Sequence, residues 1–92
     1  MSYTALVAIA NGSEEMEAVI AIDILRRAGW SVTVAAVDGD ATITASRGVR
    51  LVADARFTDT DPLAPDILVL PGGNGGTDVF RSTDSLLEAL RA

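Results

Sequence analysis

A run of four apolar residues followed by proline and glycines constrains the fold of this chain more than any other stretch. Ile67 to Leu70 show no polar alternation, which is typical of a strand buried on both faces in the middle of a helix-covered parallel sheet. Pro71 ends the strand because it has no N–H to donate, and the glycines among residues 72–76 permit close backbone approach. Ligands of open parallel sheets bind beyond the carboxyl ends of the strands, so this turn is predicted to form half of a site.

A second apolar run, residues 4–10, predicts another central strand that ends at Asn11-Gly12. A residue of the 11–13 segment is expected to cap a helix that reaches about Ala28, because glutamates fall in its first turn and arginines in its last. The middle of this helix is apolar nearly all round, so we expect cover on more than one side. A homodimer that packs through helix 14–28 would provide it.

The fold class predicted from the whole pattern is α/β, a flavodoxin-like parallel sheet sandwiched by helices. Two buried-type strands and a last helix without a C-cap predict that residues 1–92 are the amino-terminal portion of one domain, which a carboxy-terminal portion on a separate or downstream segment completes. The other predicted elements are a strand over 30–37, a hairpin of residues 42–44 and 49–53, a surface loop over 58–65, a short helix over 77–81 and a final helix capped by Ser82 or Thr83.

Composition narrows the possible chemistry. Thirteen acidic residues against seven arginines leave a net charge of −6, so nucleic acid and anionic membranes are poor candidate partners. Neither a membrane-spanning run nor a secretion signal is recognisable, and a cytoplasmic location is expected. The chain has no cysteine and no histidine. A thiol nucleophile, an imidazole base and a metal site with nitrogen or sulfur ligands are therefore not predicted, and carboxylates and backbone amides are the chemical groups that remain.

The flavodoxin-like strand order brings the loops 11–17 and 71–76 together at a topological switch point. Glu17 is the candidate acid, since it lies one turn into the helix, where the facing turn would shield it while Glu14 and Glu15 stay in water. Burial would raise its pKa and let it donate or share a proton. The plain alternative is that all three glutamates only stabilise the helix start.

The amides of Gly72 and Gly73 are candidate oxyanion donors, although a tight turn explains these glycines equally well. Arg27 and Arg47 are weaker candidates for binding a substrate anion, because a solvated arginine or an interface salt bridge is the simpler explanation of each. Asp23 is unusual inside an apolar helix. Pairing with Arg26 or Arg27 is its plain explanation.

Four segments, 5–19, 23–29, 45–49 and 66–73, closely resemble the amino-terminal half of the DJ-1/PfpI superfamily, in its YajL-like and Parkinson-linked deglycase branch. The G-S-E-E-M-E-A and V-L-P-G-G motifs carry the resemblance, which extends over essentially all 92 residues. It implies a flavodoxin-like sandwich, a homodimer, and a reactive cysteine on a strand-to-helix elbow a little beyond Ala92. That nucleophile is absent from this sequence.

The resemblance also implies roles for particular residues. A protonated glutamate at the position of Glu17 hydrogen bonds the cysteine sulfur, and amides at Gly72 and Gly73 face the same sulfur. Arginines at Arg27 and Arg47 lie near the pocket mouth and the dimer interface.

The activities implied are a cofactor-independent glyoxalase or deglycase that acts on small dicarbonyls or glycated groups, with a role in oxidative stress. Two alternatives stay open. One is a non-catalytic redox-sensing chaperone of the same family, and the other is a flavodoxin-like module that binds an anion or nucleotide at residues 72–76.

Overall fold

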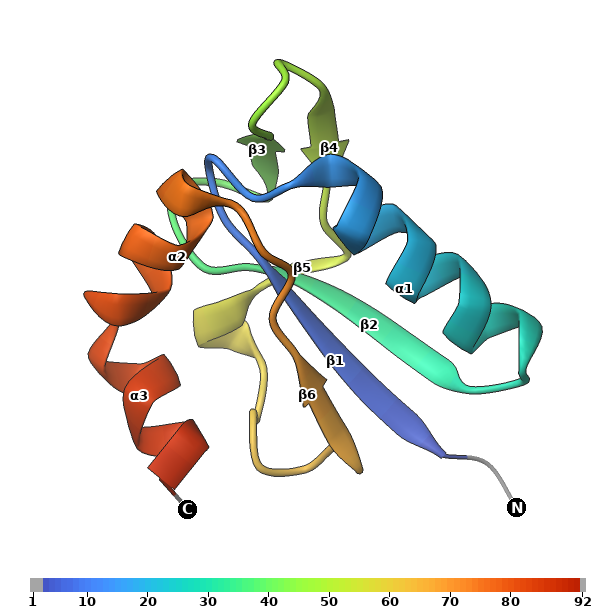
Figure 1. Cartoon of the computed structure of the whole chain (residues 1–92). Helices are drawn as coiled ribbons and strands as arrows, with labels where there is room; N and C mark the ends of the chain where they lie inside the picture. Colours follow the sequence, from blue (N-terminus) through green and yellow to red (C-terminus); the bar gives the residue numbers. More distant parts are fainter. Residues whose placement is uncertain (1–2, 92) are drawn as a thin grey trace.

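Strand β1, Thr4–Ile9, lies in the interior of the sheet that organises the fold (Figure 1). In the computed structural model, which describes residues 3–91, β1 pairs in parallel with β2, Ser31–Ala36, on one side and with β6, Ile67–Val69, on the other. The short strand β5, Ala55–Arg56, extends the sheet beyond β2, giving the order β5-β2-β1-β6. The predicted flavodoxin-like order around β1 is confirmed.

Helices cover both faces of this sheet. Helix α1, Glu15–Arg27, lies on one face, whereas α2, Asn74–Arg81, and α3, Asp84–Arg91, lie on the other (Figure 1). Alternate side chains of β1 enter two separate cores, since successive residues of a strand point to opposite faces. Val7 and Ile9 pack in the core that contains Ala18 of α1, and Leu6 and Ala8 pack in the core that contains Phe57, Phe80 and Leu86.

A small hairpin stands apart from the main sheet, as predicted. Strands β3, Thr42–Thr44, and β4, Arg50–Val52, pair antiparallel and lie beyond the carboxyl end of the sheet, close to the start of α1 (Figure 1). A single 3-10 turn, η1, Phe57–Asp59, follows β5. No helix within residues 3–91 is long and apolar enough to cross a membrane.

The expectation that the 67–70 strand is central and buried on both faces is wrong for the described part of the chain. Among residues 3–91, β6 pairs with β1 alone and forms an edge of the sheet. Its first residue is exposed and the next two are half-buried. The apolar pattern of a strand with two neighbours is therefore present here without the second neighbour.

One additional strand and two helix starts also differ from the predictions. Strand β5 was not expected; its position is fixed by Asp54, whose carboxylate accepts a hydrogen bond from the Val34 N–H at 2.9 Å. Helix α2 begins at Asn74 rather than at 77, because the Gly73 carbonyl accepts the Thr77 N–H at 2.8 Å and starts the helix across the glycines.

The start of α1 is the third difference, since Glu14 caps this helix in place of a residue from 11–13. The side chains expected to cap are engaged elsewhere. The Asn11 amide bonds Asp38 and the Thr44 N–H, and the buried Ser13 hydroxyl accepts the Ala10 N–H at 3.0 Å.

Helix α1 leaves a row of apolar side chains uncovered. Ala18 is its one buried residue, whereas Met16, Val19, Ile20 and Ile24 are 47–66% exposed. These four residues form what we call the apolar face of α1. The cover expected on a second side of this helix does not come from residues 3–91.

Candidate functional site

The two predicted loops meet beyond the carboxyl ends of β1 and β6, and glycines make this contact possible. A Cβ at Gly12 would lie 2.7 Å from the Gly75 Cα, and a Cβ at Gly76 would lie 2.6 Å from the Ser13 Oγ. Both distances are too short for any side chain. The predicted convergence of the loops is confirmed, and the glycines around Asn74 act in it as contact residues as well as turn residues.

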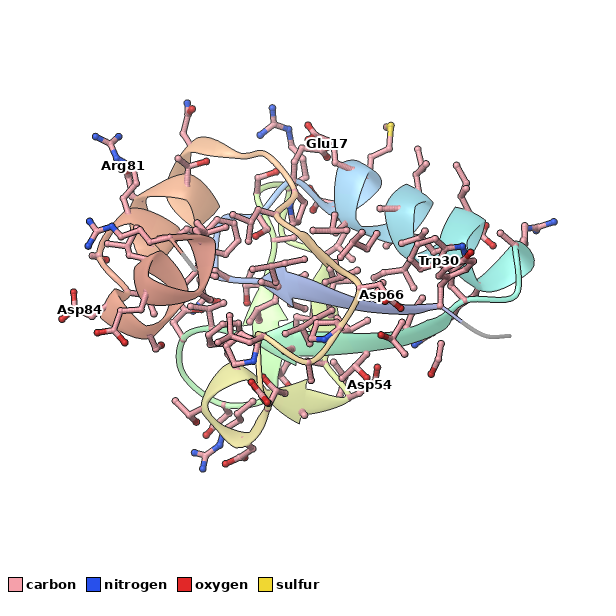
Figure 2. The ribbon with its side chains drawn as sticks, turned by 90° about the horizontal axis from the view of Figure 1, so that it is seen from below. Glu17, Trp30, Asp54, Asp66, Arg81 and Asp84 are labelled. Carbon is pink, nitrogen blue, oxygen red and sulfur yellow. The ribbon has the colours of Figure 1, made fainter. Side chains whose placement is uncertain are left out.

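Glu17 bridges the two loops. Its Oε1 accepts a hydrogen bond from the Gly72 N–H at 2.9 Å, across a sequence separation of 55 residues. Figure 2 shows Glu17 at the start of α1, beside the segment that joins β6 to α2. Within residues 3–91, the second carboxylate oxygen, Oε2, has no hydrogen-bond partner. One oxygen is therefore held in place while the other is available.

The expected shielding of Glu17 is wrong for the described residues, because Glu17 is exposed while Glu14 and Glu15 are half-buried. The reason is a division of roles among the three glutamates. Glu14 folds over the helix start and accepts the N–H groups of Met16 and Glu17, both at 3.0 Å. The facing turn touches the end of the Glu17 side chain and leaves its outer side open.

The two candidate oxyanion donors are not equivalent. The Gly72 N–H is occupied by Glu17, so it orients the carboxylate and is not a free donor. The Gly73 N–H has no acceptor within the described residues 3–91. Gly73 also caps α2 with φ +113°, a conformation open to glycine. Of the two amides, that of Gly73 is the one available to stabilise a negative charge.

Glu15 has a role that the sequence analysis missed. Its carboxylate accepts the Ser46 hydroxyl at 2.8 Å and the Arg47 N–H at 3.0 Å, which ties the β3–β4 turn to α1. The pKa of Glu15 is lowered, chiefly by its own backbone N–H and further by the Ser46 hydroxyl and the N–H groups of Arg47 and Val49, while desolvation opposes the shift. The sequence around Glu15 does not predict these contacts, because they join residues far apart in the chain.

Of the two candidate arginines, Arg47 lies at the site and Arg27 does not. The Arg47 side chain borders an open pocket of about 460 Å³ between the hairpin turn and the start of α2. Arg27 lies at the far end of α1 from Glu17, where its Nε bonds the Asp23 carboxylate at 2.7 Å. The plain explanation of Asp23, an ion pair on the helix surface, is confirmed. The other pocket-lining residues are Gly12, Glu14, Ser46, Gly73, Asn74 and Gly75.

A second pocket, largely apolar and of about 250 Å³, lies on the other side of the same turn. Gly72 lines it, and helices α2 and α3 contribute Phe80 and Leu87. Within residues 3–91 there is no group of three carboxylates that would hold a metal ion. The site therefore consists of the anchored carboxyl group of Glu17, the available N–H of Gly73 and the two pockets beside the turn.

Known proteins resemble this chain both in sequence and in structure. A model of the DJ-1/PfpI family matches residues 3–92. Protein DJ-1 homolog B of Arabidopsis thaliana is 48% identical over 94% of this chain and 20% of its own length, and protein dj-1beta of Drosophila melanogaster is 41% identical over 100% and 49%.

Two crystal structures superpose closely on the same residues. The VC2308 protein does so with a TM-score of 0.95 at 46% identity, covering 100% of this chain and 47% of its own. Oxidized Toxoplasma gondii DJ-1 has a TM-score of 0.93 at 38% identity, covering 98% and 49%. The chain spans about half the length of these two structures and of the Drosophila relative, and a fifth of the Arabidopsis relative.

Proposed function

Because this chain belongs to the DJ-1/PfpI family, we propose that it supplies Glu17 and the Gly72–Gly73 turn to a cysteine-dependent site. A carboxy-terminal segment brings the cysteine and completes the domain, which we call the complete domain. Its proposed substrates are small dicarbonyls such as methylglyoxal, or the groups that they glycate. The observation that carries this proposal is the 2.9 Å hydrogen bond from the Gly72 N–H to Glu17 Oε1.

The proposed chemistry uses each oxygen of Glu17 differently. With Oε1 held by Gly72, a carboxyl O–H at Oε2 donates a hydrogen bond to the cysteine sulfur and keeps its own proton. This hydrogen bond favours the thiolate form of the cysteine, which is the attacking species. The thiolate forms a C–S bond with the substrate aldehyde carbon, and the carbonyl electron pair moves onto oxygen. The Gly73 N–H stabilises that developing charge, as an oxyanion donor does. No cofactor takes part in this step.

Two surfaces beside the turn support a completing segment. Strand β6 has an open edge within the described residues, and exposed edges pair readily with further strands. The apolar pocket lined by Gly72, Phe80 and Leu87 lies at the turn whose Gly72 N–H bonds Glu17. The relatives of about twice this length are consistent with a larger domain.

The assembly that we propose is a homodimer through the apolar face of α1, because large exposed apolar side chains on one helix face favour burial against a partner. The proposed location is the cytoplasm, where a thiol nucleophile stays reduced. An anion or nucleotide module is not proposed. Glu14 lines the pocket beside Gly73 and Gly75, and its carboxylate would repel a phosphate.

The test of the proposed function is methylglyoxal consumption by the complete domain and by its Glu17→Ala variant. Alanine removes the carboxyl group, and with it both the Gly72 contact and the hydrogen bond to the sulfur. We expect kcat/KM to fall about a hundredfold, the size typical of losing a positioned proton donor. Glu88→Ala, the same exchange at an exposed site on α3, serves as the matched control and should leave turnover unchanged.

Two outcomes would contradict the proposal. Unchanged turnover in Glu17→Ala would remove the mechanism. Absence of turnover in the unmodified complete domain, together with altered assembly once its cysteine is oxidised, would instead support the redox-sensing chaperone alternative.

A further inference from the structure

Glu14 contacts both halves of the candidate site, through its side chain and through its backbone. Its carboxylate accepts the Glu17 N–H at 3.0 Å. Its own N–H donates to the Gly72 carbonyl at 2.7 Å, and the Gly72 N–H donates to Glu17 Oε1. The three residues therefore form a closed ring of hydrogen bonds that joins the start of α1 to the turn after β6.

The bond to the Gly72 carbonyl also sets the direction of the Gly73 amide. The chain has no cis peptide bonds among its described residues, and in a trans peptide the N–H of one residue points opposite to the C=O of the residue before it. Because the Gly72 carbonyl points at Glu14, the Gly73 N–H points away from Glu14. This is the amide that lacks an acceptor within residues 3–91.

A peptide between two glycines has little conformational preference of its own, since neither residue has a Cβ to restrict rotation. The contact with Glu14 supplies the restriction. The packing of Gly73 against Glu14 is also tight, because a Cβ at Gly73 would lie 2.6 Å from the Glu14 N. A short hydrogen bond and close packing act together on one peptide.

We propose that Glu14 is a positioning residue, which holds the Glu17 carboxyl group and the Gly73 N–H in their working directions without touching substrate. This inference rests on the proposed function for the identity of the groups that it positions. The arrangement itself, a side chain that fixes one group and a backbone N–H that fixes the other, depends only on the three contacts. A capping role alone would account for the side-chain contacts but not for the bond to Gly72.

The test compares Glu14→Ala and Glu14→Asp in the complete domain. Alanine removes the cap on Glu17, whereas aspartate is a preferred N-cap that can accept the same N–H groups. With methylglyoxal as the probe, we expect Glu14→Ala to lower kcat about tenfold or more at nearly constant KM, and Glu14→Asp to recover most of it. Glu88→Ala is the matched control on a helix surface.

A second measurement reads the geometry without turnover. The Gly72 amide resonance in ¹H–¹⁵N spectra should move in Glu14→Ala, in the same direction as in Glu17→Ala, which removes the acceptor of the Gly72 N–H. Glu14→Ala keeps the backbone N–H that bonds the Gly72 carbonyl, so the Gly73 resonance should move less than that of Gly72. An unmoved Gly72 resonance, with shifts confined to Met16 and Glu17, would reduce Glu14 to a helix cap and overturn the inference. If the unmodified domain shows no methylglyoxal turnover, the proposed function fails, and these resonances still decide the positioning role.

Discussion

At the residue scale, the adjacent glycines of the turn perform different tasks. Gly72 has an ordinary φ, and the three atoms nearest to an added Cβ all belong to the carboxylate of Glu17, the closest at 2.7 Å. Gly73 has φ +113°, and an added Cβ would meet the backbone of Glu14 and Gly12, both at 2.6 Å. A side chain can move out of the way and a packed backbone cannot. A side chain at Gly72 would therefore disturb the site alone, whereas a side chain at Gly73 would disturb both the site and the fold.

We therefore predict opposite outcomes for Gly72→Ala and Gly73→Ala in the complete domain. Gly72→Ala should change the free energy of unfolding by less than about 1 kcal/mol but lower kcat/KM about tenfold or more, because it displaces the Glu17 carboxylate. Gly73→Ala should destabilise the fold by about 3 kcal/mol or more, through backbone strain and the clash. Urea unfolding and methylglyoxal assays measure the two effects.

Gly39→Ala separates strain from the clash, since Gly39 also has a positive φ, +63°, but has nothing within 4 Å of an added Cβ. It should cost only about 1–2 kcal/mol, the penalty of a left-handed alanine. Equal losses of stability at positions 72 and 73 would contradict the assigned roles.

The sequence singled out Glu17 correctly as the glutamate whose side chain meets the glycine turn, because its place one helical turn from the loop depends only on periodicity. It did not separate the roles of Glu14 and Glu15. Those roles depend on contacts with Gly72 and Ser46, and neither contact has a signature in the nearby sequence. All three residues are acidic and lie at or near the start of the helix, so these two properties do not distinguish them.

At the element scale, the contact between α1 and the hairpin depends on the ionised form of Glu15. Its folded-state pKa is lowered by its own backbone N–H first, and then by Ser46 and the N–H groups of Arg47 and Val49. A lowered pKa means that the folded chain binds fewer protons than the unfolded chain. The stabilisation is therefore present above the unfolded-state pKa and is lost as pH falls through the folded-state pKa.

We predict that Glu15→Gln lowers the urea midpoint of the complete domain at neutral pH. This difference should disappear as pH falls through the lowered folded-state pKa of Glu15, where Glu15 itself becomes protonated. Denaturant titrations followed by circular dichroism at several pH values measure the midpoints. Glu88→Gln should leave the midpoint nearly unaltered throughout. A constant gap between native protein and Glu15→Gln over the whole range would show that hydrogen bonding, and not ionisation, makes the contact.

Elements with strong periodicity were predictable, and elements that depend on distant partners were not. Strand β1 and helix α1 follow from long apolar runs and charged helix ends. Strand β5 has two residues and exists because β2 lies beside it. Strand β6 was identified correctly but placed centrally, since an apolar run reports the burial that a strand requires and not which residues provide it.

At the scale of the whole molecule, two surfaces lack cover within residues 3–91, and they lie on different elements. One is the edge of β6 with the apolar pocket beside Gly72, and the other is the apolar face of α1. The first adjoins the candidate site, so the segment that covers it would also contact Glu17. The second surface lies along the length of α1, and a second copy of the domain is its proposed cover.

The proposed dimer predicts that Ile20→Glu produces monomers. Ile20 lies within the apolar face of α1 and is 50% exposed, and in a two-fold interface the substitution would occur in both copies. Burying an unpaired carboxylate costs about 3 kcal/mol, so the two copies together raise the dissociation constant about ten-thousandfold. Sedimentation velocity of the complete domain over a concentration series measures the shift.

Leu63→Glu, on the loop before β6 and 63% exposed, should leave the dimer intact. Monomers in the unmodified domain, or equal weakening by both variants, would mean that α1 is not the interface.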